Sequence, residues 1–75
     1  MASMTPAGAV HAACSGDMDA LIGAREFAER LGRDAYRTKA PMPAEFAGAP
    51  VLSEGFAEGL ANARCEHEQV LAGLL

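Results

Sequence analysis

The sequence is poor in large aromatic side chains: its 75 residues include no tryptophan, one tyrosine and three phenylalanines. Its hydrophobic content of 51% owes much to alanine, so bulky apolar side chains are few. A chain of this length buries only about 60% of the surface that its unfolded form exposes. We therefore expect a thin core that gains stability from a second chain or another bound partner.

The sequence also has no run of 18 apolar residues, so we expect no membrane span. Two cysteines, Cys14 and Cys65, are too few for a disulfide framework. The first residues lack the basic start and apolar centre of a secretory leader, which predicts a cytoplasmic protein with reduced thiols. A net charge of −4 argues against indiscriminate binding to nucleic acid or to anionic membranes.

The longest helical pattern runs from Asp17 to Arg37. Its apolar residues recur at spacings of three and four, which a helix can use and a strand cannot; they are Leu21, Ala24, Phe27, Ala28, Leu31 and Ala35. Asp17 is suited to cap the start of this helix. Ala24, Ala28 and Gly32 recur every four residues, which predicts a shallow groove that a second helix can approach closely.

A second long helix is predicted from Ser53, as its N-cap, to Leu75. Its apolar stripe consists of Phe56, Leu60, Ala63, His67, Val70, Leu71 and Leu74. Glycine in a helix interior costs about 1 kcal/mol relative to alanine, so Gly55 and Gly59 need a structural reason. Close packing against the small residues of the first helix supplies one. We predict an all-α fold in which residues 17–75 form an antiparallel helical hairpin.

The remaining segments are the N-terminus and the connection. Residues 1–16 are predicted to be partly ordered or to form a short helix that starts after Thr5, with Gly16 closing it. Three prolines interrupt the pattern in residues 38–52, so no long helix is expected there. A single turn at residues 43–47 would place Phe46 over the helix ends. The connection is longer than usual for a helical hairpin, and we interpret it as closing the core, with a functional loop as the alternative.

Charge is unevenly distributed along the chain. Four bases and one acid lie between Arg30 and Lys39, whereas four acids and one base lie between Ser53 and Glu68. In one interpretation, the basic segment contacts RNA through Arg30, Arg33, Tyr36 and Arg37. In the other, the pairing of the two helices sets these bases against neighbouring acids. Within the first helix, the spacing predicts the ion pairs Glu26–Arg30 and Glu29–Arg33.

Candidate chemistry is sparse. Four residues are potential zinc ligands, namely His11, Cys14, Cys65 and His67. Cys65 and His67 are two apart and point to different sides of a helix, so they converge poorly. His67 alone on the apolar stripe is typical of a hydrogen-bonded core or interface residue. The sequence contains no phosphate-binding glycine loop and no supported Ser-His-Asp arrangement, so we expect no enzyme, no cofactor and no small-molecule substrate.

A partial resemblance to a known family rests on short motifs between Glu29 and Arg64. Gly32-x-x-Ala35 is followed by prolines in the connection and by Gly55-Phe56-x-Glu58 at the start of the second helix. This layout resembles ribosome modulation factor and its short relatives, which are two-helix proteins with a proline-containing connection. The resemblance implies ribosome binding and translational dormancy, with Arg30, Arg33 and Arg37 as the positions available for RNA.

The sequence as a whole favours a non-enzymatic helical interaction module, such as an accessory subunit, inhibitor or regulator, that binds a protein partner or its own copy. The predicted contact residues are Val70, Leu71, Leu74, Leu75 and Phe46. Alternatively, the C-terminal residues fold back on Leu21 and Ile22. A ribosome- or RNA-associated factor using the Arg30–Lys39 face is the second hypothesis, and a zinc-stapled helical module is the third.

Overall fold

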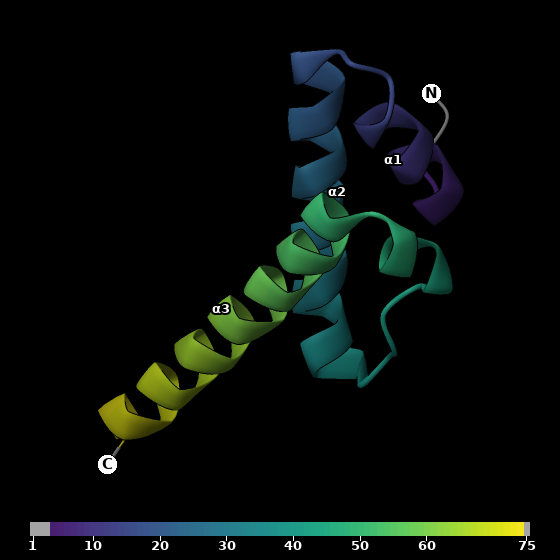
Figure 1. Ribbon diagram of the computed structural model, residues 1–75. Helices are drawn as coiled ribbons and strands as arrows, with labels where there is room; N and C mark the ends of the chain where they lie inside the picture. The colour runs from purple at the N-terminus through teal and green to yellow at the C-terminus, as the bar shows by residue number, and fades with distance from the viewer. Residues whose placement is uncertain (1–3, 75) are drawn as a thin grey trace.

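The computed structural model describes residues 4–74 and contains helices α1 (Pro6–Ala13), α2 (Met18–Thr38) and α3 (Pro50–Leu74), with a short 3-10 helix η1 (Ala44–Gly48) before α3 (Figure 1). No strand occurs in this described range. The predicted all-α class is confirmed, and so is the packing of two long helices against each other. The molecule measures 47 × 26 × 22 Å along its principal axes.

Local sequence explains where the first two helices begin and end. The side chain of Thr5 accepts a hydrogen bond from the backbone N–H of Gly8 (3.1 Å), and Pro6 follows as the first helical residue. Gly16 has a φ of 81°, which turns the chain between α1 and α2. The carboxylate of Asp17 then accepts from the N–H of Asp19 (3.0 Å) at the start of α2. The predicted short helix and both caps are confirmed.

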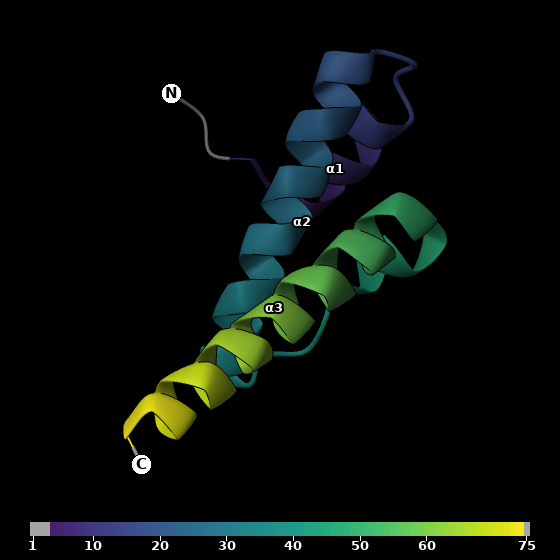
Figure 2. The same cartoon turned by 90° about the vertical axis from the view of Figure 1, so that its left-hand side faces the viewer.

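The two long helices run parallel, so the antiparallel pairing predicted from the sequence is wrong. Arg25 of α2 pairs with Glu58 of α3, and Arg33 pairs with Glu66, so the partners advance together along both helices. In an antiparallel pair, later residues of one helix would face earlier residues of the other. Figures 1 and 2 show both helices running toward the end of the molecule where the C-terminus lies.

The length of the connection follows from this parallel arrangement. From Thr38 the chain must return to the level of Arg25, a distance of about 20 Å along α2. Residues 39–49 run back beside α2 and include η1 (Figure 1). An antiparallel hairpin would need no such return. The unusual length of the connection is therefore a signal that the second helix runs parallel to the first.

Close approach of α2 and α3 depends on glycine. A Cβ atom at Gly59 would overlap the backbone carbonyl of Glu29, and one at Gly32 would overlap the carbonyl of Phe56 and lie 2.9 Å from the nitrogen of Leu60. Gly32 and Gly59 are both buried. The predicted packing of the two small-residue stripes is therefore confirmed, although the helices run in the other relative direction.

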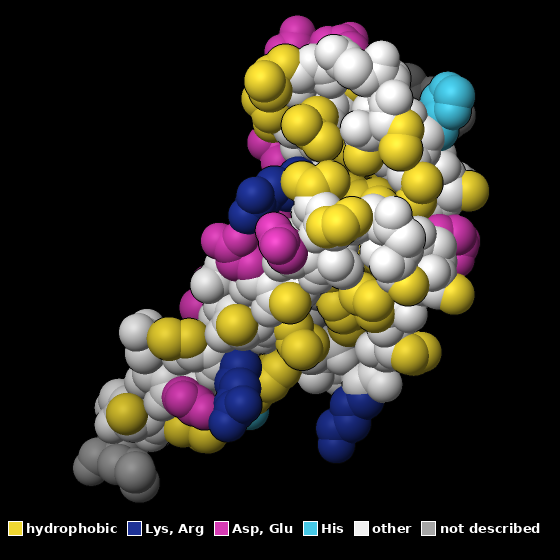
Figure 3. Space-filling view, in the orientation of Figure 1, with side chains coloured by type: hydrophobic (Ala, Val, Ile, Leu, Met, Phe, Trp, Pro, Cys, Tyr) yellow, Lys and Arg dark blue, Asp and Glu magenta, His cyan; other side chains and the backbone are white. Residues whose placement is uncertain are grey.

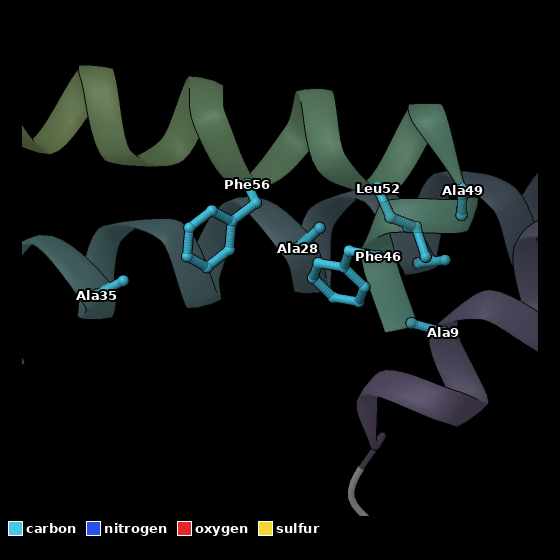
Figure 4. Close-up of a cluster of buried hydrophobic side chains, with 8 residues drawn as sticks. Ala9, Ala28, Ala35, Phe46, Ala49, Leu52 and Phe56 are labelled. Carbon is cyan, nitrogen blue, oxygen red and sulfur yellow. The ribbon is translucent and has the colours of Figure 1, made fainter. Parts of the chain in front are cut away.

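Phe46 of η1 is the centre of the core (Figure 4). Its side chain is 0% exposed, and its ring makes edge-on contacts with Phe27 and Phe56 at centroid distances of 6.5 and 6.4 Å. Ala9 of α1 is also fully buried, so α1 belongs to the same core. The single turn predicted at residues 43–47 is confirmed as η1. The prediction that Phe46 closes over the helix ends is wrong, because its ring packs against Phe27 in the middle of α2. The prediction of Phe46 as a partner contact is wrong, because its ring is already covered within the chain.

The start of α3 also differs from the prediction. The helix begins at Pro50, because a proline fits the first helical turn, where its missing N–H would have no acceptor. Ser53 therefore lies inside the helix and is not its cap. Its hydroxyl donates to the carbonyl of Pro50 (3.0 Å). We interpreted Pro50 as an interruption, whereas it starts the helix.

Candidate functional site

The two halves of α3 have different surroundings. Residues before Arg64 include the buried Leu52, Gly55, Phe56 and Gly59, whereas every residue from Arg64 to Gly73 is exposed. We call Arg64–Gly73 the distal half of α3. Figure 1 shows it diverging from α2, and Figures 1 and 2 both show it projecting beyond the body of the molecule. Its apolar side chains Val70 and Leu71 are 61% and 49% exposed.

The divergence of the helices opens a groove of about 780 Å³ between the end of α2 and the distal part of α3. One wall comes from the last turns of α2 and its cap: Arg33, Asp34, Tyr36, Arg37 and Lys39. The other wall comes from α3: Ala63, Glu66, His67 and Val70. In Figure 3, lysine and arginine side chains lie at the end of α2, and hydrophobic side chains are spread along the projecting part of α3.

A polar bridge connects the two walls of the groove. The hydroxyl of Tyr36 shares a hydrogen bond of 2.8 Å with Nδ1 of His67, and the rings meet edge-on at 5.7 Å. The prediction of His67 as a hydrogen-bonded interface residue is confirmed. This bridge marks the last side-chain link between α2 and α3 in the described residues, and α3 extends beyond it.

Ion pairs on the groove walls are distributed differently from the prediction. Arg33 pairs across the helices with Glu66 (3.1 Å), and Arg37 pairs with Asp34 one turn away (3.5 Å). Lys39, which closes α2 with a φ of 59°, has no ion-pair partner among residues 4–74. The wall of the groove formed by α2 therefore carries a net positive charge.

The ion pairs predicted within α2 are replaced by others. Glu29 pairs with Arg25 (3.2 Å) and not with Arg33, and none of the ion pairs in the described part of the chain contains Glu26 or Arg30. Hydrogen bonds from Arg25 to Glu58 and to Glu29 raise the pKa of its guanidinium. Arginine is already charged at any physiological pH, so the raised pKa does not change the charge of Arg25 there.

The groove brings together residues from two separate predictions. Arg33, Tyr36 and Arg37 of the RNA hypothesis face Val70 of the partner hypothesis across the same groove, whereas Arg30 does not line it. Leu71 lies exposed beside Val70. The side chain of Leu74 and the whole of Leu75 fall outside the described part. Asp34, Ala63 and Glu66 were missed as groove residues, because the antiparallel arrangement places the end of α2 near the start of α3.

Two of the sequence-based alternatives are wrong for this fold. The distal half of α3 cannot fold back on Leu21 and Ile22, because parallel pairing places these residues at the opposite end of the molecule (Figure 1). The zinc hypothesis fails for a similar reason. His11 and Cys14 belong to the end of the molecule near α1, Cys65 and His67 lie on the distal half of α3, and no group of three or more potential ligands forms within residues 4–74.

No family model matches this chain, and no curated protein or solved structure was found to be similar to it. The resemblance to ribosome modulation factor therefore stays a prediction. None of the helices in the described range combines the length and apolar character that crossing a membrane requires.

Proposed function

We propose that this chain is a non-enzymatic helical interaction module that binds a protein through the groove between α2 and the distal half of α3. The observation that carries the proposal is the exposure of the distal half, with Val70 and Leu71 in a helix that the rest of the chain does not cover. Grooves beside an exposed apolar helix face are typical of sites that take up a further helix.

The energetics of short helices support this proposal. A helical segment of about ten residues is marginal in water, because most helical stability in proteins comes from packing of an apolar face. Within the chain, the distal half is supported mainly by Tyr36–His67 and Arg33–Glu66, which are both exposed contacts. Packing against a partner would supply the missing stabilisation.

The state of the cysteines fits a reducing compartment. Both cysteines are free and exposed, and the proposal places the protein in the cytoplasm, where thiols stay reduced.

A capture experiment with native lysate tests the proposal. The double variant Val70→Asp, Leu71→Asp places two charges on the exposed apolar surface of the distal half, and we expect it to lose the proteins that the unmodified chain retains. The control Ile22→Asp changes an apolar residue that is 50% exposed at the opposite end of the molecule. Equal capture by all three proteins would contradict the proposal.

A second candidate function is contact with ribosomal RNA. It is favoured by the position of Arg33, Tyr36, Arg37 and Lys39 on one wall of the groove, where cations could contact phosphates beside an aromatic ring. If it is correct, the double variant Arg37→Glu, Lys39→Glu should abolish salt-sensitive co-sedimentation with ribosomes. The control Arg64→Glu, on α3 outside the groove lining, should retain it. Unchanged co-sedimentation of the double variant would exclude contact with ribosomal RNA through this wall.

A further inference from the structure

We infer that the groove is filled by the distal half of α3 from a second copy of this chain, so that two copies form a two-fold symmetric dimer. This inference rests on the proposed function and specifies its partner. Three observations support it: the excess surface of the single chain, the charges of the two groove walls, and the presence of both complementary surfaces on one chain.

The single chain exposes more surface than a compact protein of its size. Its accessible surface is 5259 Å², whereas a compact monomer of 7.7 kDa exposes about 4300 Å². The difference of about 900 Å² is close to the roughly 800 Å² that each partner buries in a standard protein interface. The radius of gyration, 13.6 Å, also exceeds the value of about 11 Å for a compact domain of this length. The exposed distal half of α3 contributes to both values, and a second copy would cover it.

The charges of the groove walls favour an acidic helix as the occupant. The α2 wall of the groove carries three bases and one acid, Arg33, Arg37 and Lys39 against Asp34. Among the described residues, α3 forms an ion pair with only Arg33 of these bases. The distal half of α3 carries two acids, Glu66 and Glu68, and one base. Within residues 4–74, Glu68 forms only an exposed ion pair with Arg64 on the same helix (3.2 Å). Such pairs are weak, so Glu68 is free to approach the basic wall of another copy.

Each chain carries both halves of the interface. It offers a groove with a basic wall, and it projects an acidic helix with exposed Val70 and Leu71. A two-fold axis lets each copy insert its helix into the other's groove, which closes the assembly at two copies. An RNA strand fits the groove less well, because its phosphates would meet Asp34 and Glu66 on the same walls. An unrelated acidic helix would use the groove alone, whereas a second copy uses both the groove and the projecting helix of each chain.

Sedimentation equilibrium between about 5 µM and about 500 µM, a range that detects weak dimers, is the first arm of the test. We expect the mass of the unmodified chain and of the control Ile22→Asp to double with concentration. The variant Val70→Asp, Leu71→Asp should stay monomeric over the whole range. Its helical CD spectrum should match that of the unmodified chain at the lowest concentration, which separates loss of the interface from loss of the fold. A monomeric mass for the unmodified chain over the whole range would overturn the inference.

Spin labels on the two free cysteines locate the interface. In the Cys14→Ser variant, labels on Cys65 of the two copies should lie much closer together than the 47 Å length of one chain. In the Cys65→Ser variant, labels on Cys14 should lie farther apart than those on Cys65, because Cys14 is at the opposite end of the molecule. A dimer with the reverse order of distances would use another face and would overturn the inference.

The outcomes also separate this inference from the proposed function. A monomer that still captures a lysate protein through Val70 and Leu71 would exclude the second copy and leave the interaction module in place. A monomer that captures nothing would exclude both. Salt-sensitive binding to ribosomes that depends on Arg37 and Lys39, together with a monomeric mass, would replace the second copy by RNA.

Discussion

The two halves of α3 belong to one continuous helix but have opposite roles in the structure. In the half that begins at Pro50, Leu52 is fully buried and Gly59 lies directly against the backbone of α2. In the distal half, all residues from Arg64 to Gly73 are exposed. The first half therefore determines the stability of the fold, and the second half provides a surface. Substitutions in the two halves should separate stability from association, and the following predictions test that separation.

The largest loss of stability is expected from Phe46→Ala. Its ring is fully buried between α2 and α3 and touches two other aromatic rings, so its removal leaves a cavity in a thin core. We expect the free energy of unfolding, measured by urea denaturation, to fall by about 3–4 kcal/mol. The control Met42→Ala removes a partly exposed side chain from the same connection and should cost less than about 0.5 kcal/mol. A loss below 1 kcal/mol for Phe46→Ala would contradict its central position.

Gly59→Ala should have the next largest effect. The added methyl group would overlap the carbonyl of Glu29, and backbone cannot yield as a flexible side chain can. We expect the helices to be forced apart at a cost of about 2–3 kcal/mol. Gly73→Ala is the matched control in the distal half, where an added Cβ meets nothing within 4 Å. It should stabilise the chain by up to about 1 kcal/mol through helix propensity. Similar changes in urea midpoint for both variants would show that the two halves of α3 do not differ in how closely they pack against the rest of the chain.

The comparison also shows what the sequence could predict. Spacings of three and four, together with Thr5 and Asp17 as caps, correctly predict helices near those observed, because these signals are local. The small-residue stripes correctly predict close contact between α2 and α3. Neither signal indicates the relative direction of the two helices, since a groove of small residues accepts a helix running either way. The parallel arrangement therefore could not be derived from periodicity.

The groove was predictable only in part for the same reason. Arg33, Tyr36 and Arg37 were identified from their charge and spacing, and Val70 from its apolar character. Their meeting across one groove depends on the parallel direction. The available signal was the length of the segment between Lys39 and Ala49, which is sufficient for the return path and too long for a tight turn. Its prolines also obscured the start of α3, since Pro50 is compatible both with a break and with a first helical turn.

A smaller effect is expected at the boundary between the two halves. Tyr36→Phe removes the hydroxyl that bonds His67, while keeping the edge-on ring contact. Because the pair is exposed, we expect a loss of about 0.5–1 kcal/mol. A double-mutant cycle with His67→Ala measures the coupling directly, and the expected coupling energy is about 0.5–1 kcal/mol. A coupling of zero would mean that the bridge does not hold the distal half near α2.

The smallest effect on stability is expected from Leu71→Asp in dilute solution. The side chain is 49% exposed and belongs to the half of α3 that the core does not support. The free energy of unfolding should change by less than about 0.5 kcal/mol. Hydrogen exchange provides a sharper measurement, because amides between Arg64 and Gly73 should exchange at least about tenfold faster than those between Leu52 and Leu60. Raising the protein concentration should slow exchange in the distal half of the unmodified chain but not in Leu71→Asp. Concentration-dependent protection in both proteins would show that association does not use the face containing Leu71.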